Sequence, residues 1–196
     1  MFGPSSIEHP NRKWLPLAIA GAVAVLVLIV GVTRYNSLVS QREGVDSAWA
    51  QVQNVLQRRA DLIPNLVNTV KGYAAHEKEL FEHIADARAR LSGAKTPAEA
   101  SAASGELDSA LSRLLVVVEA YPQLKANENF IRLQDELAGS ENRIAVERMR
   151  YNEVVRDYDA TIKRFPNVVF ARLFGFGAKD YFEADVKAQH VPEVKF

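Results

Sequence analysis

The sequence predicts an all-α protein in which an N-terminal transmembrane helix is followed by an antiparallel four-helix bundle of long, coiled-coil-like helices. Three observations predict this fold: an uncharged apolar stretch, apolar positions that then recur every three and four residues, and the absence of long apolar–polar alternation. We expect a disordered tail at 1–13, an anchor at 14–33, a helical bundle at 34–165 and an aromatic-rich tail at 166–196 packed on the bundle.

The anchor is the run from Trp14 to Thr33, which carries no charge over 20 residues. A helix of this length spans the roughly 30 Å hydrocarbon core of a bilayer at about 1.5 Å per residue. Trp14 and Tyr35 suit the two interfacial regions. Two other interpretations are a buried core helix, which is rarely so long and apolar, and a cleaved signal peptide, which needs a shorter apolar run and a small-residue cleavage site. We expect an uncleaved anchor in contact with the lipid bilayer.

Basic residues flank the anchor on both sides. Arg12 and Lys13 precede it, and Arg34 and Arg42 follow it. The tendency of basic flanks to stay in the cytoplasm therefore gives only a slight preference for a cytoplasmic N-terminus. No glycine, proline or polar cluster separates Thr33 from the first apolar repeat, so the anchor helix should continue into the bundle.

The bundle is predicted from four apolar stripes with a period near 3.5 residues, which is typical of helices packed nearly parallel or antiparallel. The stripes are Tyr35, Leu38, Val45, Trp49, Val52, Leu56 and Ile63; Leu66, Val70, Tyr73, Leu80, Ile84, Ala87 and Leu91; Leu107, Leu111, Leu114, Val118 and Tyr121; and Phe130, Leu133, Leu137, Ile144, Tyr151, Val155, Tyr158, Ile162 and Phe165.

Breaks between these stripes are marked by proline and by small polar residues. Pro64 is expected to end or kink the first helix, since proline lacks an N–H and clashes with the preceding turn. Residues 92–106 are expected to form a loop or a weak helix. Pro122 should bend or end the third helix, Asn127 should cap the fourth, and residues 165–166 should end it.

Four charged residues occupy positions on these apolar stripes, namely Arg42, Arg59, Glu77 and Arg148. One interpretation is that they lie at the bundle edge, with long stems on apolar surface and charged ends in water. The other is that they form interhelical polar contacts that set the register of the helices. They are the candidate interhelical contacts.

The tail contains four closely spaced phenylalanines, Phe170, Phe174, Phe176 and Phe182. Aromatic side chains at this density rarely stay solvated, which favours a tail folded back on the bundle. The alternative is an exposed apolar interaction patch for a partner or for the membrane surface.

Residue patterns for chemistry are weak. His76 and His83 lie two helical turns apart, about 10 Å along the axis, which is too far to share one metal ion. Gly175 and Gly177 form a lone GxG that no predicted strand precedes, and no cysteine is available as a nucleophile or ligand. We expect a protein that is not an enzyme, with no catalytic residue, metal or cofactor.

Charge argues against nucleic acid as a partner. The chain has 24 basic and 24 acidic residues. Without residues 1–33, which hold Arg12, Lys13 and Glu8, the domain keeps 22 basic and 23 acidic residues. A domain so balanced has no field that would hold a phosphate backbone.

Several blocks of the sequence resemble the LemA family. They are YNSLV at 35–39, QRRADLIPNLV at 57–67, YAAHE at 73–77, YPQLKAN at 121–127, ENRIA at 141–145, FP at 165–166 and YFEA at 181–184. The resemblance covers nearly everything from the anchor to residue 185. It implies a single-pass protein of the bacterial cytoplasmic (inner) membrane with an antiparallel helical bundle, and it supplies no catalytic residues. It also implies a link to membrane metalloproteases of the HtpX type, to envelope stress or to membrane organisation.

Two functions follow as expectations. The first is a scaffold or adaptor that binds another membrane protein, such as a membrane protease, in envelope homeostasis. The alternative is a homo-oligomer, a self-assembling structural protein that organises or shapes the membrane.

Overall fold

The computed structural model describes residues 14–183, and over this range the chain is helical with no strand. The helices are α1 (Leu15–Lys71), α2 (Lys78–Gly93), α3 (Pro97–Glu119), α4 (Pro122–Lys125), α5 (Glu128–Lys163) and α6 (Asn167–Phe174). The all-α prediction is confirmed. The predicted tail at 1–13 and the end of the tail at 184–196 lie outside the described residues.

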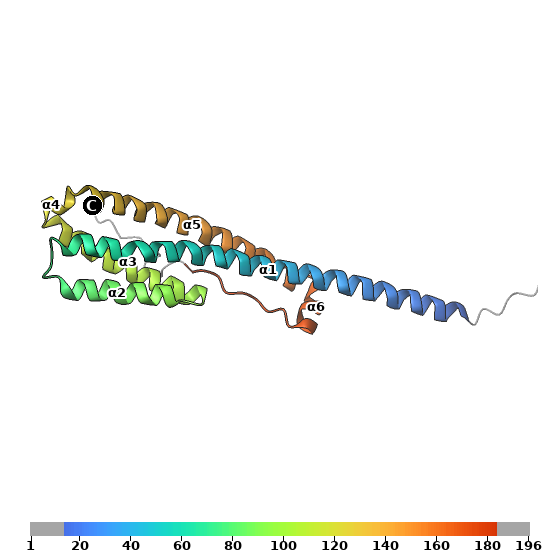
Figure 1. Cartoon of the computed structure of the whole chain (residues 1–196). Coiled ribbons are helices and arrows are strands. Elements are labelled where there is room, and N and C mark those ends of the chain that lie inside the picture. Colours follow the sequence, from blue (N-terminus) through green and yellow to red (C-terminus); the bar gives the residue numbers. More distant parts are fainter. Residues whose placement is uncertain (1–13, 184–196) are drawn as a thin grey trace, which may run out of the picture.

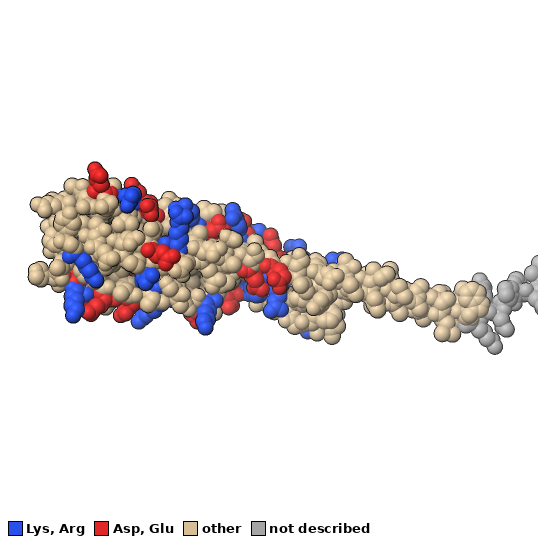
Figure 2. All heavy atoms as spheres, viewed as in Figure 1, with Lys and Arg blue, Asp and Glu red and all other residues tan. Residues whose placement is uncertain are grey.

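The molecule is a rod built around α1, which at 57 residues is about 86 Å long. Helix α5 runs back along α1, α2 and α3 form a hairpin at the end far from the N-terminus, and α6 lies beside the middle of α1 (Figure 1). The N-terminal part of α1 extends beyond the other helices. Charged side chains gather over the bundle, whereas this outer part of α1 shows none in the same view (Figure 2).

The outer part of α1 is long and apolar enough to cross a membrane, and none of the residues in its most apolar stretch is buried in the protein. Leu17 and Leu28, for example, are exposed. A helix buried in a soluble core would have the opposite pattern, so that interpretation is wrong. The predicted continuation of the helix past Thr33 into the bundle is confirmed.

Of the two outcomes expected at Pro64, an end or a kink, the structure excludes the end: α1 continues through it to Lys71. Proline removes the N–H that would bond the carbonyl four residues earlier, here that of the fully buried Ala60. Arg88 on α2 donates its Nε–H to this Ala60 oxygen over 2.7 Å. The carbonyl that Pro64 leaves free is therefore satisfied by a neighbouring helix, which lets the proline remain in mid-helix.

The second apolar stripe is not one helix, which also corrects the sequence interpretation. Its first residues belong to α1, and a turn follows in which the amides of Tyr73 and Ala74 both bond the Val70 carbonyl at 2.9 Å. Helix α2 begins only at Lys78. In the turn, the stripe residue Tyr73 is exposed and its neighbour Ala74 is buried instead.

Helix starts follow local side-chain chemistry. In α3, the Glu99 amide donates to Thr96 Oγ1 at 3.2 Å and the Thr96 amide donates to Glu99 Oε2 at 3.3 Å, which forms a capping box. Backbone N–H groups of Lys95 and Thr96 lower the pKa of the Glu99 carboxyl. In α5, Asn127 caps as predicted by accepting from the Phe130 amide at 3.2 Å. Of the loop or weak helix expected at 92–106, the structure has helix over most of the range, because the capping box starts α3 at Pro97.

Candidate functional site

Arg59 is the predicted polar residue that the structure places deepest in the bundle, with 5% of its surface exposed. Its Nη2 donates to Asp108 Oδ1 on α3, and its Nη1 lies 2.6 Å from Glu141 Oε2 on α5, at an angle that suits an ion pair rather than a hydrogen bond. One buried guanidinium on α1 therefore contacts acidic side chains of both α3 and α5. Both carboxylate side chains are about half exposed.

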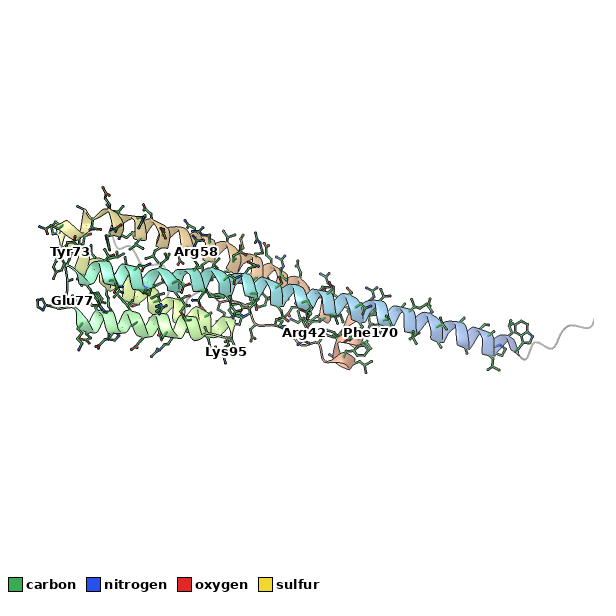
Figure 3. All side chains as sticks on the ribbon, viewed as in Figure 1. Arg42, Arg58, Tyr73, Glu77, Lys95 and Phe170 are labelled. Carbon is green, nitrogen blue, oxygen red and sulfur yellow. The ribbon has the colours of Figure 1, made fainter. Side chains whose placement is uncertain are left out.

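The other three predicted polar residues do not join helices. Arg42 is exposed, and no ion pair or hydrogen bond of its side chain is found within residues 14–183. Glu77 lies in the turn and immediately precedes α2, which corrects its placement on a helical stripe (Figure 3). Arg148 contacts the tail instead: its guanidinium lies 4.3 Å from the centre of the Phe182 ring, and its Nη2 donates to the Glu183 carbonyl at 3.0 Å.

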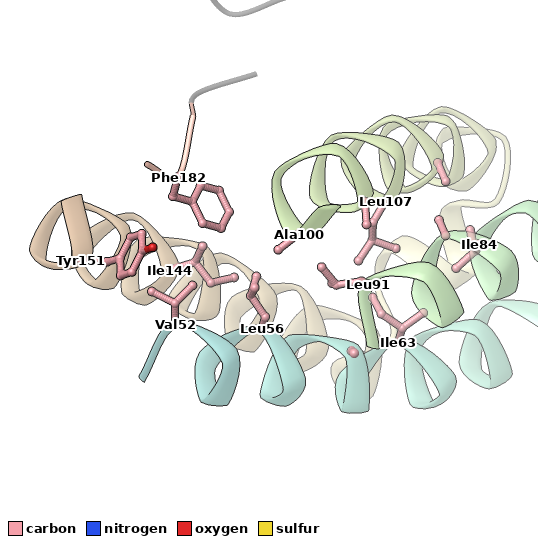
Figure 4. Close-up of a cluster of buried hydrophobic side chains, with 14 of the residues drawn as sticks. Val52, Leu56, Ile63, Ile84, Leu91, Ala100, Leu107, Ile144, Tyr151 and Phe182 are labelled. Atoms are coloured by element: carbon pink, nitrogen blue, oxygen red, sulfur yellow. The ribbon is translucent and has the colours of Figure 1, made fainter. Parts of the chain in front are cut away.

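The four phenylalanines of the predicted patch are separated by the structure. Phe176 and Phe182 are buried, Phe170 is half-buried, and Phe174 has 49% of its surface exposed. Phe182 lies between α5 and the N-terminal end of α3 (Figure 4). They do not form one exposed patch, because the chain turns at Gly175, whose left-handed backbone (φ 74°) ends α6, and then runs back along the bundle.

The segment 177–183 is extended and is held mainly by side chains of α5. Asn152 makes a paired contact with Phe182: its Oδ1 accepts from the Phe182 amide at 2.9 Å, and its Nδ2 donates to the Phe182 carbonyl at 3.0 Å. The Tyr151 hydroxyl donates to the Asp180 carbonyl at 2.7 Å. An extended segment has no hydrogen bonds of its own, so these contacts satisfy its backbone.

Lys179 adds a further contact to α5 and one to α1. Its amide donates to Asp159 Oδ1 on α5 at 3.1 Å, and its ammonium group lies 2.7 Å from Asp46 on α1.

Burial and the nearby charges of Asp180 and Asp46 raise the pKa of Tyr151 to about 12. Burial also raises the pKa of Tyr158. Both phenols therefore stay protonated near neutral pH, and the Tyr151 hydroxyl serves as a hydrogen-bond donor to the segment.

A second feature is a groove of about 890 Å³ between α2 and α3. Small side chains of α3 form its floor, including those of Ala102, Gly105 and Ser109, and Glu183 lines one end. Its rim is charged; Arg90 on α2 and Glu106 on α3 form an ion pair across it at 2.7 Å.

Within the described part of the chain, no group of three or more His, Asp and Glu side chains is placed to hold a metal ion. His83 is exposed, and its Nε2 lies 3.8 Å from Glu79 one turn away on the same helix. The nearest approach to a ligand pair on α2 is therefore this single contact at the surface.

Sequence reasoning missed Asp108, Glu141, Asn152 and Asp159, which hold Arg59 and the extended segment. Nothing in their local sequence separates them from the other polar residues of their helices. The available signal was an indirect one: Arg59 on an apolar stripe requires a nearby acid when it is buried.

Comparison with known proteins relates the chain to two groups of bacterial proteins. It is 27% identical to magnetosome protein MamQ of Magnetospirillum gryphiswaldense over 206 residues, covering 89% of this chain and 76% of that protein. Magnetosome protein MamQ 2 of Paramagnetospirillum magneticum is 27% identical over 200 residues, covering 89% and 73%. Protein LemA of Metamycoplasma hominis is 23% identical over 176 residues, covering 84% and 78%.

The family comparison matches residues 48–196 to the LemA family. This range takes in α2 to α6 and most of the bundle part of α1, including Arg59, the groove and the extended segment. The resemblance seen in the sequence is thereby confirmed, and the chain belongs to the LemA family of membrane-associated helical proteins.

Proposed function

We propose that this protein is a membrane-tethered scaffold, without catalytic activity, that binds another membrane protein through the surface of its bundle. The observation that carries the proposal is the continuity of α1, which joins an exposed apolar stretch of membrane-spanning length to the core of the bundle without a break. A hinge would let the bundle reorient. A continuous helix instead presents the same bundle surface at a constant distance from the bilayer.

That distance can be estimated. From residue 34 to Lys71, α1 has 38 residues, which corresponds to about 57 Å of helix beyond the apolar stretch. The α2–α3 groove is therefore held well away from the bilayer surface, where the extramembrane part of a partner can reach it. Its floor of small side chains allows close approach of another helix, and its charged rim provides polar contacts.

A photo-cross-linking residue placed at Ser109 in the groove tests this proposal in native membranes. Met149, exposed on α5, is the matched control position. We expect one dominant adduct with a different protein from position 109, none from position 149, and loss of the adduct when Ala102→Trp fills the groove. Adducts of equal yield from both positions would contradict a specific scaffold surface.

The alternative, a self-assembling protein that organises the membrane, predicts a different result in the same experiment. Adducts would then have masses that are multiples of this chain. Two relatives are named magnetosome proteins, a name that agrees with a role at a membrane and does not separate the two functions. Intact mass of the membrane-extracted protein tests the tether itself, since a chain that begins near residue 34 would mean that the apolar stretch is removed.

A further inference from the structure

Helix α6 and Phe165, two residues before it, leave an unusual amount of apolar surface uncovered. Phe165 is 84% exposed, Leu173 72% and Val169 54%. Val169 and Leu173 lie one turn apart on the same face of α6, and Phe174 follows at 49%. Exposure of such a contiguous apolar group to water would cost free energy and favour association. We therefore expect another surface to bury it.

The position of α6 along α1 indicates which surface buries this apolar group. The Phe170 ring packs over Gly31, where an added Cβ would lie 3.6 Å from Phe170 Cε1 (Figure 3). The Phe174 ring stacks edge-on against Tyr35 at 5.0 Å between centroids. Gly31 is two residues before the end of the uncharged run at Thr33, about 3 Å along the axis. Helix α6 therefore docks at the level where the apolar stretch of α1 ends.

The charges around this level all have one sign. Between Leu15 and Arg42, and again between residues 160 and 178, every charged residue is basic. These residues are Arg34, Arg42, Lys163, Arg164 and Arg172. Lys163 pairs with Asp159 at 3.0 Å, while Arg164 and Arg172 have no ion pair within the described residues. On the face shown in Figure 2, the acidic residues lie on the bundle and none lies on the apolar end.

We propose that α6 is a second membrane contact, lying in the interface of the bilayer beside α1. Phe165, Val169 and Leu173 would meet the acyl chains, and Arg164 and Arg172 would bind the headgroups of anionic phospholipids. An apolar face combined with basic residues is the pattern of interfacial helices that bind anionic membranes. This inference rests on the anchoring of α1 in the bilayer, which belongs to the proposed function.

The depth of α6 can be measured in the full-length chain, which has no native cysteine. Single cysteines carrying a spin label replace Leu173, Val116 or Val25, in vesicles of equal parts phosphatidylcholine and phosphatidylglycerol. Val116 is the matched control, since it is 74% exposed on α3, and Val25 reports the anchor. We expect labels at 173 and 25 to collide with oxygen and to be shielded from a water-soluble nickel chelate, and the label at 116 to show the reverse.

Three outcomes would overturn the inference. A label at 173 as open to the nickel chelate as the label at 116 would place α6 in water while the anchor remains in lipid. Shielding at 173 with spin–spin broadening between copies would mean that a second chain covers the face. A label at 25 that is open to the nickel chelate would contradict the anchoring of α1 itself. This outcome differs from a failure of the α6 contact alone, in which the label at 25 stays shielded.

The headgroup part of the inference has its own test. In the Leu173→Cys chain, a fluorophore attached at position 173 should be quenched more by brominated phosphatidylglycerol than by brominated phosphatidylcholine, and added salt should reduce the difference. We expect Arg164→Gln with Arg172→Gln to bring the quenching ratio to one, and the corresponding lysine variants to keep it. Arg113→Gln with Arg132→Gln, at exposed positions distant from α6, is the matched control. An unchanged ratio in the first pair would rule out these arginines as headgroup ligands.

Discussion

At the scale of single residues, the bundle depends on a small number of polar contacts with unequal environments. Arg59 is buried, whereas its partners Asp108 and Glu141 are each about half exposed. A carboxylate left alone at such a position can be hydrated by water, but a guanidinium left alone in the core cannot. The two sides of the same ion pair should therefore respond differently to substitution.

The first prediction follows from this asymmetry. Arg59→Met should lower the free energy of unfolding by about 1–3 kcal/mol, since the freed carboxylates reach water. Asp108→Asn combined with Glu141→Gln should cost more, about 3–5 kcal/mol, because it leaves a buried charge uncompensated. Urea unfolding of the detergent-solubilised chain measures both, and the opposite order would show that Arg59 is hydrated.

The second prediction concerns Tyr151 and alkaline pH. Its pKa of about 12 in the folded protein lies above the ordinary value of 10, so the folded state keeps the phenol proton where the unfolded state loses it. This contribution to stability is complete below pH 10 and is lost as the pH rises through 12. Tyr151→Phe should lose stability less steeply across this window than the parent chain does. Parallel alkaline slopes in thermal melting would contradict the assignment.

At the scale of elements, α1 shows how a helix and its neighbour compensate for a local defect. Proline in a helix interior costs about 3 kcal/mol relative to alanine, partly through the lost hydrogen bond. Here Arg88 of α2 donates a hydrogen bond to the Ala60 carbonyl that the proline leaves free. The proline on α1 and the arginine on α2 are therefore expected to act together.

The third prediction is a coupling between these two residues. Arg88→Met should cost about 1–2 kcal/mol in the parent chain, because it leaves a buried carbonyl unsatisfied. In a Pro64→Ala background the restored amide takes that carbonyl, and the same substitution should cost about 1 kcal/mol less. Arg90→Met, which breaks a surface ion pair instead, is the control and should cost the same in both backgrounds.

The extended segment is the other element whose position depends on side chains rather than on helical packing. Phe182 is buried, packs under the Arg148 guanidinium and lies 6.3 Å from the Trp49 ring. It connects the tail to α1 and α5 at once, and therefore supplies most of the apolar attachment of the segment.

The fourth prediction tests that attachment. Phe182→Ala should lower the free energy of unfolding by about 3–5 kcal/mol, as for other large core aromatics. Phe165→Ala, at a position 84% exposed, should change it by less than about 0.5 kcal/mol in detergent. Equal effects of the two substitutions would mean that the segment is not packed on the bundle.

At the scale of the whole molecule, the two ends of the long helix α1 differ in how far other helices cover them. The apolar end of α1 is uncovered, and the far end is sheathed by α2, α3 and α5 (Figure 1). If the apolar end spans a bilayer as proposed, the side that holds the N-terminus also determines the side that holds the bundle, since the helix is continuous.

The fifth prediction concerns that orientation. The flanking basic residues favour a cytoplasmic N-terminus, which would put the bundle outside the cytoplasm. A single cysteine at the exposed Ser109 should then react with a membrane-impermeant maleimide in intact spheroplasts, while one at Val25 should not. Reaction at 109 only after the membrane is opened would show the reverse orientation.

The sequence by itself determined the helical class, the apolar stretch long enough to span a membrane and the family, because apolar period, length and motif blocks are local properties of the chain. It also indicated Asn127 as a cap and placed Arg59 on an apolar stripe, without deciding whether its guanidinium lies in the core or in water. Only the tertiary structure decided that α1 passes through Pro64, that Asp108 and Glu141 receive Arg59, and that α6 docks at Gly31. Each of these depends on groups 28 to 139 positions apart in the chain. Their partners are chosen by how the helices pack, and a sequence pattern a few turns long carries no information about that choice.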